Sequence, residues 1–133
     1  MKIINLNLII IMEILTSKID EYWVHFQAGR IENNLIHPRT IIKCYHDNFY
    51  VLQLSFYPNK KNLPENYYDI NSKLVYLRYS MSMYSYILDI LRNEKPIYYS
   101  YSETSKLGFI RTGKEPVGEG EIEQIELEEA TDL

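Results

Sequence analysis

Tyrosine is the residue type whose number and placement in this chain best suit surface chemistry. The sequence holds thirteen tyrosines, four phenylalanines and one tryptophan, together 14% of its residues. A tyrosine ring can stack on a nucleic-acid base or pack against a protein while its hydroxyl stays in water. Single-stranded nucleic acid and a protein surface are therefore the two ligand classes that this composition favours.

An open sheet face would be lined by the aromatic and basic residues that alternate along the predicted strands. These residues are Trp23, His25, Lys43, Tyr45, Tyr57, Tyr76, Arg78 and Arg111, and a predicted loop adds Lys60 and Lys61. Basic groups beside stacking rings are suited to holding the phosphates and bases of a single strand. The alternative is a purely structural role, because tyrosine also has a high β propensity and fills half-buried sheets. The sequence leaves both interpretations open.

Cysteine and histidine give little support for a metal site or for nucleophilic catalysis. Cys44 and His46 lie two residues apart on a predicted strand, so both are expected on one face. His25 or His37 would have to join them around zinc, and the spacing matches no established zinc site. A single cysteine is typically a buried thiol. We therefore predict no metal site and no cofactor.

The sequence contains neither a known nucleotide-binding motif nor a rigid pair of carboxylates. The glycines at 118 and 120 follow the predicted folded body, whereas a phosphate-binding loop lies between a strand and a helix. Glu65 and Asp69 fall in a predicted loop, and general acid–base catalysis needs groups that are held rigidly. The chain is therefore predicted to be a non-enzymatic binding module.

Period-two alternation of aromatic and β-branched residues from Glu21 onward predicts the strands that would position these side chains. The strands are expected at 22–26, 40–46, 49–57, 74–79, 97–101 and 107–112, with a further return strand at 31–36. Asp47-Asn48 predicts a two-residue hairpin loop between 40–46 and 49–57. The segment 58–73 is predicted to be a long loop.

Alternation along the strand at 49–57 also predicts which of its faces is buried. Tyr50, Leu52, Leu54 and Phe56 share one face, and successive strand residues point to opposite sides of a sheet. We expect this face to be core.

A change of period between about 81 and 92 predicts the one main helix. Tyr84, Ile87, Leu88 and Leu91 recur at helical spacing, and Pro96 prevents continuation. A second apolar flank of this helix comprises Met83, Tyr86 and Ile90. A single helix that is apolar on two sides favours a protein partner, so these three residues predict self-association as a symmetric dimer.

The net charge of -4 conceals two oppositely charged parts of the chain. Residues 1–114 carry 14 basic and 10 acidic side chains, for a net charge of +4, whereas 115–133 carry eight acidic and no basic ones. The segment 114–133 is predicted to be a flexible, disordered tail. Such a tail can compete with phosphate for a basic body, so that it autoinhibits binding, or it can simply solubilise the protein. Its aliphatic residues, Ile122, Ile125 and Leu127, could also dock into a basic, apolar groove.

The first twelve residues resemble a secretory signal only superficially. Asn5 and Asn7 interrupt the apolar run, and no small-residue cleavage pattern follows it. Either Met12 is the true start or residues 3–11 form an extra edge strand. One cysteine and the lack of an apolar run of about 18 residues favour a cytoplasmic protein with no membrane partner.

The sequence as a whole predicts an α+β fold in three parts. These are an N-terminal extension at 1–12, a single domain at 13–113, and the acidic tail at 114–133. The domain is expected to be an antiparallel sheet of five to seven strands packed on one main helix. Its predicted function is binding of single-stranded nucleic acid on the aromatic and basic face, and the alternative is a protein-interaction or self-association module.

Overall fold

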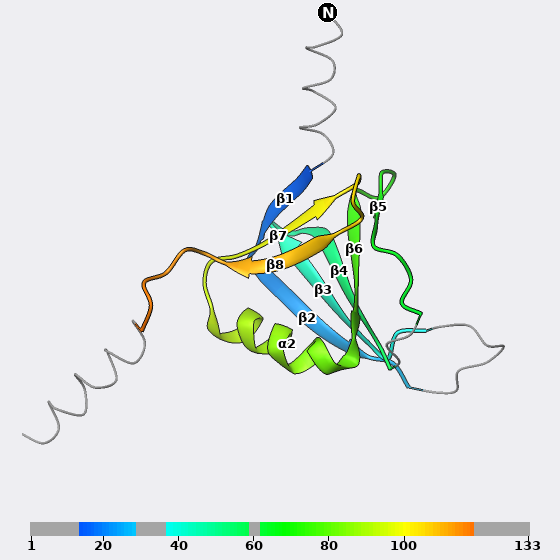
Figure 1. Cartoon of the computed structure of the whole chain (residues 1–133), viewed down its shortest axis with the longest axis horizontal. Helices are drawn as coiled ribbons and strands as arrows, with labels where there is room; N and C mark the ends of the chain where they lie inside the picture. The colour runs from blue at the N-terminus through cyan, green and yellow to red at the C-terminus, as the bar shows by residue number, and fades with distance from the viewer. Residues whose placement is uncertain (1–13, 29–36, 59–61, 119–133) are drawn as a thin grey trace, which may run out of the picture.

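The computed structural model describes residues 14–28, 37–58 and 62–118, which form two sheets and one helix (Figure 1). The three-stranded sheet has the order β1-β7-β8, with bounds Ile14–Ile19, Ile97–Ser102 and Gly108–Thr112. The five-stranded sheet has the order β2-β3-β4-β6-β5, with bounds Glu21–Phe26, Thr40–His46, Phe49–Tyr57, Leu74–Ser80 and Tyr67–Asp69. The α+β class is therefore as predicted.

The division of the strands differs from the single antiparallel sheet that we expected. The described strands fall into two sheets, and β4 pairs with β6 in parallel. A single residue, Asp20, separates β1 from β2, and the chain changes sheets there. β5 lies inside the predicted loop at 58–73, and β1 was not predicted. The predicted strand at 31–36 and the predicted edge strand at 3–11 fall outside the described residues.

The β3–β4 hairpin is confirmed, and it contains a bulge that moves one predicted core residue. Asp47 and Asn48 have φ values of 50° and 68°, as a two-residue turn of the primed type requires. Cys44 pairs with Leu52 but Tyr45 pairs with Tyr50, so Val51 is an extra residue on β4. The Tyr50 side chain consequently lies on the face opposite Leu52, and its predicted core position is wrong.

The predicted helix corresponds to a 3₁₀ turn, η1 (Met81–Met83), followed by α2 (Tyr84–Asn93). The Ser80 side chain accepts a hydrogen bond from the backbone N–H of Ser82 and so caps this segment. Ile87 and Leu91 are the buried residues of α2. No helix among the described residues is long and apolar enough to cross a membrane.

One apolar core joins the three-stranded sheet, α2 and one face of the five-stranded sheet. The buried cluster includes Ile19, Tyr99 and Tyr101 from the first sheet, Ile87 and Leu91 from α2, and Ile42, Leu52, Leu54, Phe56 and Leu77 from the second. A methyl group added at Gly108 would overlap the Leu77 side chain, so β8 lies tightly against β6. The opposite face of the five-stranded sheet therefore lies outside this core.

Candidate functional site

The outer face of the five-stranded sheet carries most of the predicted aromatic and basic residues. One row crosses all five strands, because Trp23 pairs with Lys43, Lys43 with Gln53, Gln53 with Tyr76, and Tyr76 with Tyr67. Neighbouring outward positions hold His25, Tyr45, Tyr50 and Arg78. We call these nine residues the aromatic-basic face. The row exists because paired residues in adjacent strands point to the same side of a sheet.

At the β2 end of this face, a lysine lies among aromatic rings. The Trp23 Nε1 donates a 2.7 Å hydrogen bond to the Tyr45 hydroxyl. The Lys43 Nζ lies 4.8 Å from the centre of the Trp23 ring and 5.4 Å from that of Tyr50. Trp23 is 43% exposed. The rings are thus fixed by contacts to one another while Trp23 stays accessible to a ligand.

A hollow of about 270 Å³ adjoins this cluster. Trp23 and Tyr45 form part of its wall, together with Glu21, Tyr22 and Asn48. It lies at the corner where β2 approaches the β3–β4 turn. An exposed ring beside an open hollow gives a flat ligand room to stack.

At the β5 end, an arginine lies beside a stacked pair of tyrosines. The rings of Tyr67 and Tyr76 are 4.6 Å apart and inclined by only 4°. The Arg78 Cζ lies 5.2 Å from the centre of each ring, and its Nη1 donates a 2.8 Å hydrogen bond to the Tyr57 hydroxyl. Asn66 accepts a hydrogen bond from the Arg78 backbone N–H and so anchors the chain before β5. Tyr67 is 40% exposed.

Hydrogen bonds link three polar side chains of β4 near the middle of this face. The Tyr50 hydroxyl donates to Gln53 Oε1 at 2.7 Å, and Gln53 Nε2 donates to the Ser55 hydroxyl at 3.1 Å. Burial raises the pKa of Tyr50 and, with the neighbouring Tyr67, that of Tyr76. These phenols are therefore neutral at pH 7, and the positive charge of the face comes from Lys43 and Arg78.

Other predicted site residues lie elsewhere. Tyr57 is only 2% exposed, so it supports Arg78 and offers no ring to a ligand. Arg111 is on β8 in the other sheet, where its Cζ lies 4.6 Å from the centre of the Tyr98 ring. Lys60 and Lys61 fall outside the described residues.

The three residues predicted for self-association differ in exposure. Tyr86 is 67% exposed and Met83, in the 3₁₀ turn before α2, is 41% exposed. Ile90 packs against the buried core. The accessible part of this flank therefore consists of Met83 and Tyr86.

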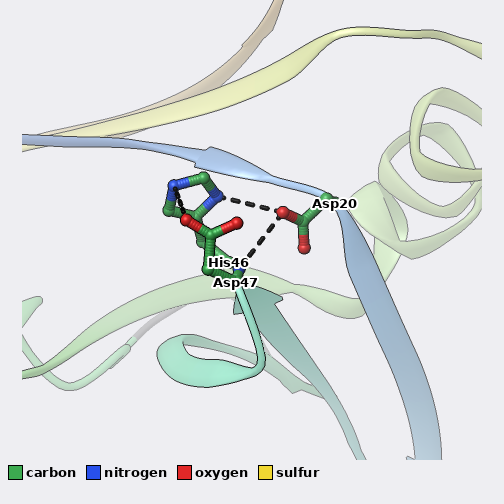
Figure 2. A group of neighbouring side chains, drawn as sticks. All are labelled: Asp20, His46 and Asp47. Carbon is green, nitrogen blue, oxygen red and sulfur yellow. Dashed lines mark hydrogen bonds and ion pairs between the residues drawn. The ribbon is translucent and has the colours of Figure 1, made fainter.

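A separate polar cluster lies at the corner between β1 and β2 (Figure 2). The His46 Nδ1 is 3.0 Å from Asp20 Oδ2, and its Nε2 is 3.3 Å from Asp47 Oδ2. The backbone N–H of Asp47 donates to the same Asp20 oxygen, and this bond is the main cause of the lowered pKa of Asp20. The cluster joins the sheet corner to the β3–β4 turn.

Imidazole nitrogen and carboxylate oxygen are common metal ligands, but both ring nitrogens of His46 already face a carboxylate. The cluster is therefore best described as an imidazole held between two carboxylates. Cys44 is buried in the core, where burial raises the pKa of its thiol. The extra residue of the bulge is Val51 on β4, so alternation along β3 is unbroken, and Cys44 and His46 stay on one side of that strand as expected.

Sequence reasoning missed five residues of these sites, namely Tyr50, Gln53 and Tyr67 of the aromatic-basic face and Asp20 and Asp47 of the polar cluster. Tyr50 was assigned to the core because no sequence signal marks the bulge at Val51. Tyr67 belongs to a three-residue strand inside a predicted loop. Asp20 is brought to His46 by the change of sheet, which strand alternation does not reveal.

Comparison of the chain with protein-family models, curated proteins and solved structures finds no match. The geometry described above is therefore the basis on which a function can be argued.

Proposed function

We propose that this protein is a small binding module that holds single-stranded nucleic acid on its aromatic-basic face. The observation that carries the proposal is the row Trp23, Lys43, Gln53, Tyr76 and Tyr67, which crosses the five strands without interruption. Open faces that combine stacking rings with cations are the usual platform for single strands.

Each end of the row offers an exposed ring next to a cation. Trp23 and Tyr67 stack on bases, while Lys43 and Arg78 contact the phosphates between them. Four strand spacings of about 4.8 Å place the two rings roughly 19 Å apart, so one short oligonucleotide can contact both. The hollow beside Trp23 accommodates the stacked base.

Binding on this face should depend little on base sequence. Both ends of the Gln53 amide are already hydrogen bonded, to Tyr50 and to Ser55, so this amide is not free to read base edges. Stacking and phosphate contacts act on every base alike. The acidic tail opposes binding, because its eight acidic side chains offset the positive charge that attracts the phosphates.

Removal of the exposed rings tests the proposal. Trp23→Ala and Tyr67→Ala in the full chain should each weaken binding of a labelled single-stranded oligonucleotide by about 1–3 kcal/mol, the usual contribution of a ring that stacks on a base. Fluorescence anisotropy at low salt provides the measurement. Phe109→Ala is the matched control, because it removes a 54% exposed ring from the other sheet. Equal losses in all three variants would contradict a binding site on this face.

The alternative function, protein interaction or self-association, has one specific observation in its favour. Tyr86 and Met83 expose apolar surface beside α2, on a different part of the molecule from the aromatic-basic face. A symmetric dimer would bury these side chains.

A further inference from the structure

A pocket of about 480 Å³ lies where the end of α2 meets the corner between β1 and β2. Its apolar floor contains Ile19, Leu91 and Ile97, which are at most 9% exposed. Pro96, on the connection from α2 to β7, forms another part of the lining. The pocket includes Tyr22, which packs against the core and also borders the hollow beside Trp23, but it is lined by none of the nine residues of the aromatic-basic face.

On the rim of this pocket, the basic side chains without an ion-pair partner in the described part of the chain outnumber the acidic ones. Lys18, Arg92 and Lys95 are exposed and have no ion-pair partner among the described residues. Two acidic residues, Asp20 and Glu94, also line it, but Asp20 is already engaged by His46 and by the backbone N–H of Asp47. Arg92, in the last turn of α2, partly offsets the negative end of the helix dipole.

A further cation lies close to this rim. Lys18 pairs with Tyr98, and Tyr98 pairs with Arg111 on the next strand, so the two basic residues are two strand spacings apart on one side of the three-stranded sheet. Two spacings correspond to about 10 Å, comparable to the distance over which charges interact at physiological salt. An acidic, partly aliphatic ligand would therefore complement both the floor and the rim.

The C-terminal segment of this chain is itself such a ligand, and it leaves β8 beside the pocket. The backbone N–H of Gly113 donates a 3.0 Å hydrogen bond to the carbonyl of Pro96, which lines the pocket. Figure 1 shows the chain leaving β8 next to the connection between α2 and β7. Ile122 is the ninth residue after Gly113, and an extended chain of nine residues spans about 30 Å. A segment of this length is long enough to bring Ile122 back to the lining around Pro96.

We propose that residues 119–133 dock in this pocket of their own chain. Residues 115–133 carry eight acidic and no basic side chains, and Ile122, Ile125 and Leu127 are spaced among the glutamates. The aliphatic side chains lie on the floor, and the glutamates face Lys18, Arg92 and Lys95. Docking neutralises part of the positive charge of the domain without covering the aromatic-basic face. The proposal does not depend on nucleic-acid binding.

Zero-length crosslinking of the wild-type full chain tests this contact. A carbodiimide joins a carboxylate to an amine only when the two groups touch, and mass spectrometry then identifies the linked peptides. We expect tail glutamates to be joined to Lys18 and Lys95, with yields that fall as salt rises, because the contact involves exposed charges. A mixture of isotopically labelled and unlabelled protein distinguishes links within one chain from links between chains.

Three results would overturn the proposal: tail links to Lys43 on the aromatic-basic face instead, links only between chains, or no tail links beyond the adjacent Lys114.

A variant gives a second readout, because Arg92→Glu changes the rim charge without removing a crosslinked lysine. It should lower the yields at Lys18 and Lys95 about two- to fivefold, the equivalent of one exposed ion pair. Arg39→Glu makes the same charge change at the opposite end of the five-stranded sheet, next to Thr40, which pairs with Phe26. This control variant should leave the crosslinking yields unchanged.

Discussion

Individual side chains on the aromatic-basic face are positioned by one another as well as by the sheet. Trp23 is fixed by Tyr45 and Lys43, and Arg78 is fixed by Tyr57 and the stacked pair Tyr67 and Tyr76. Such mutual contacts reduce the ordering that a ligand would have to impose. The side chains of the face are therefore held in place without a ligand.

The Asp20 cluster makes a pH-dependent contribution that can be measured at the level of one residue. The folded state lowers the pKa of Asp20, chiefly through the Asp47 N–H, so the stabilisation is present above the pKa of the unfolded chain, about 4. It is lost as pH falls through the lower pKa of the folded state. Asp20→Asn should therefore reduce the melting temperature at pH 7, and the difference from wild type should shrink below about pH 4.

Thermal melts followed by circular dichroism at several pH values measure this difference. Glu65→Gln is a suitable control, because it removes an exposed carboxylate that makes no hydrogen bond among the described residues. A wild-type advantage over Asp20→Asn that stays constant from pH 7 to pH 3 would contradict the assigned role of the carboxylate.

At the scale of secondary-structure elements, the β3–β4 turn determines the register of the central strands. Asn48 has a φ of 68°, a left-handed conformation that glycine and asparagine adopt far more readily than alanine. Asn48→Ala should lower the free energy of unfolding by about 1 kcal/mol, whereas Asn48→Gly should change it by no more than a few tenths. Denaturant titration measures both variants. Equal stability of the two would show that the turn is not left-handed at this position.

Local patterns in the sequence were sufficient to predict the β3–β4 hairpin and the helix. The turn residues Asp47 and Asn48 and the helical spacing of Ile87 and Leu91 act over a few residues, so the sequence displays them directly. The change of sheet at Asp20 and the parallel pairing of β4 with β6 depend on contacts between distant segments. Alternation alone cannot reveal such contacts.

The candidate site was predictable to a similar extent. Period-two alternation places Trp23, Lys43, Tyr45, Tyr76 and Arg78 on outward positions, and the structure brings these five to one face. Arg111 lies on the other sheet because the strands divide into two. That division was not visible in the sequence.

At the scale of the whole molecule, self-association through the flank beside α2 is a separate, testable property. Tyr86 is 67% exposed, so Tyr86→Glu should not disturb the core, but it would place a charge in any interface formed by this flank. Analytical ultracentrifugation of the wild-type chain at micromolar concentrations should show a dimer, and Tyr86→Glu should convert it to a monomer with an unchanged melting temperature. A monomeric wild-type protein would eliminate this dimer.

The charge distribution of the whole chain connects the proposed binding of nucleic acid by the domain with the proposed docking of its tail. Residues 1–114, with a net charge of +4, are followed by a segment with eight acidic residues, and the pocket beside Pro96 is the place where we propose that the two meet. Deletion of 115–133 should tighten binding of single-stranded oligonucleotides, and the gain should shrink as salt rises. Anisotropy titrations of both chains at two salt concentrations measure this gain.

The chain contains one tryptophan, and that residue lies on the aromatic-basic face, so its intrinsic fluorescence reports directly on the proposed site. Titration of the wild-type protein with a single-stranded oligonucleotide at low salt should change the Trp23 emission in a saturable manner, in parallel with the anisotropy of the labelled oligonucleotide. Stacking of a base on the ring is the physical cause of the change. An absence of binding, or binding that leaves the Trp23 emission unchanged, would contradict the account.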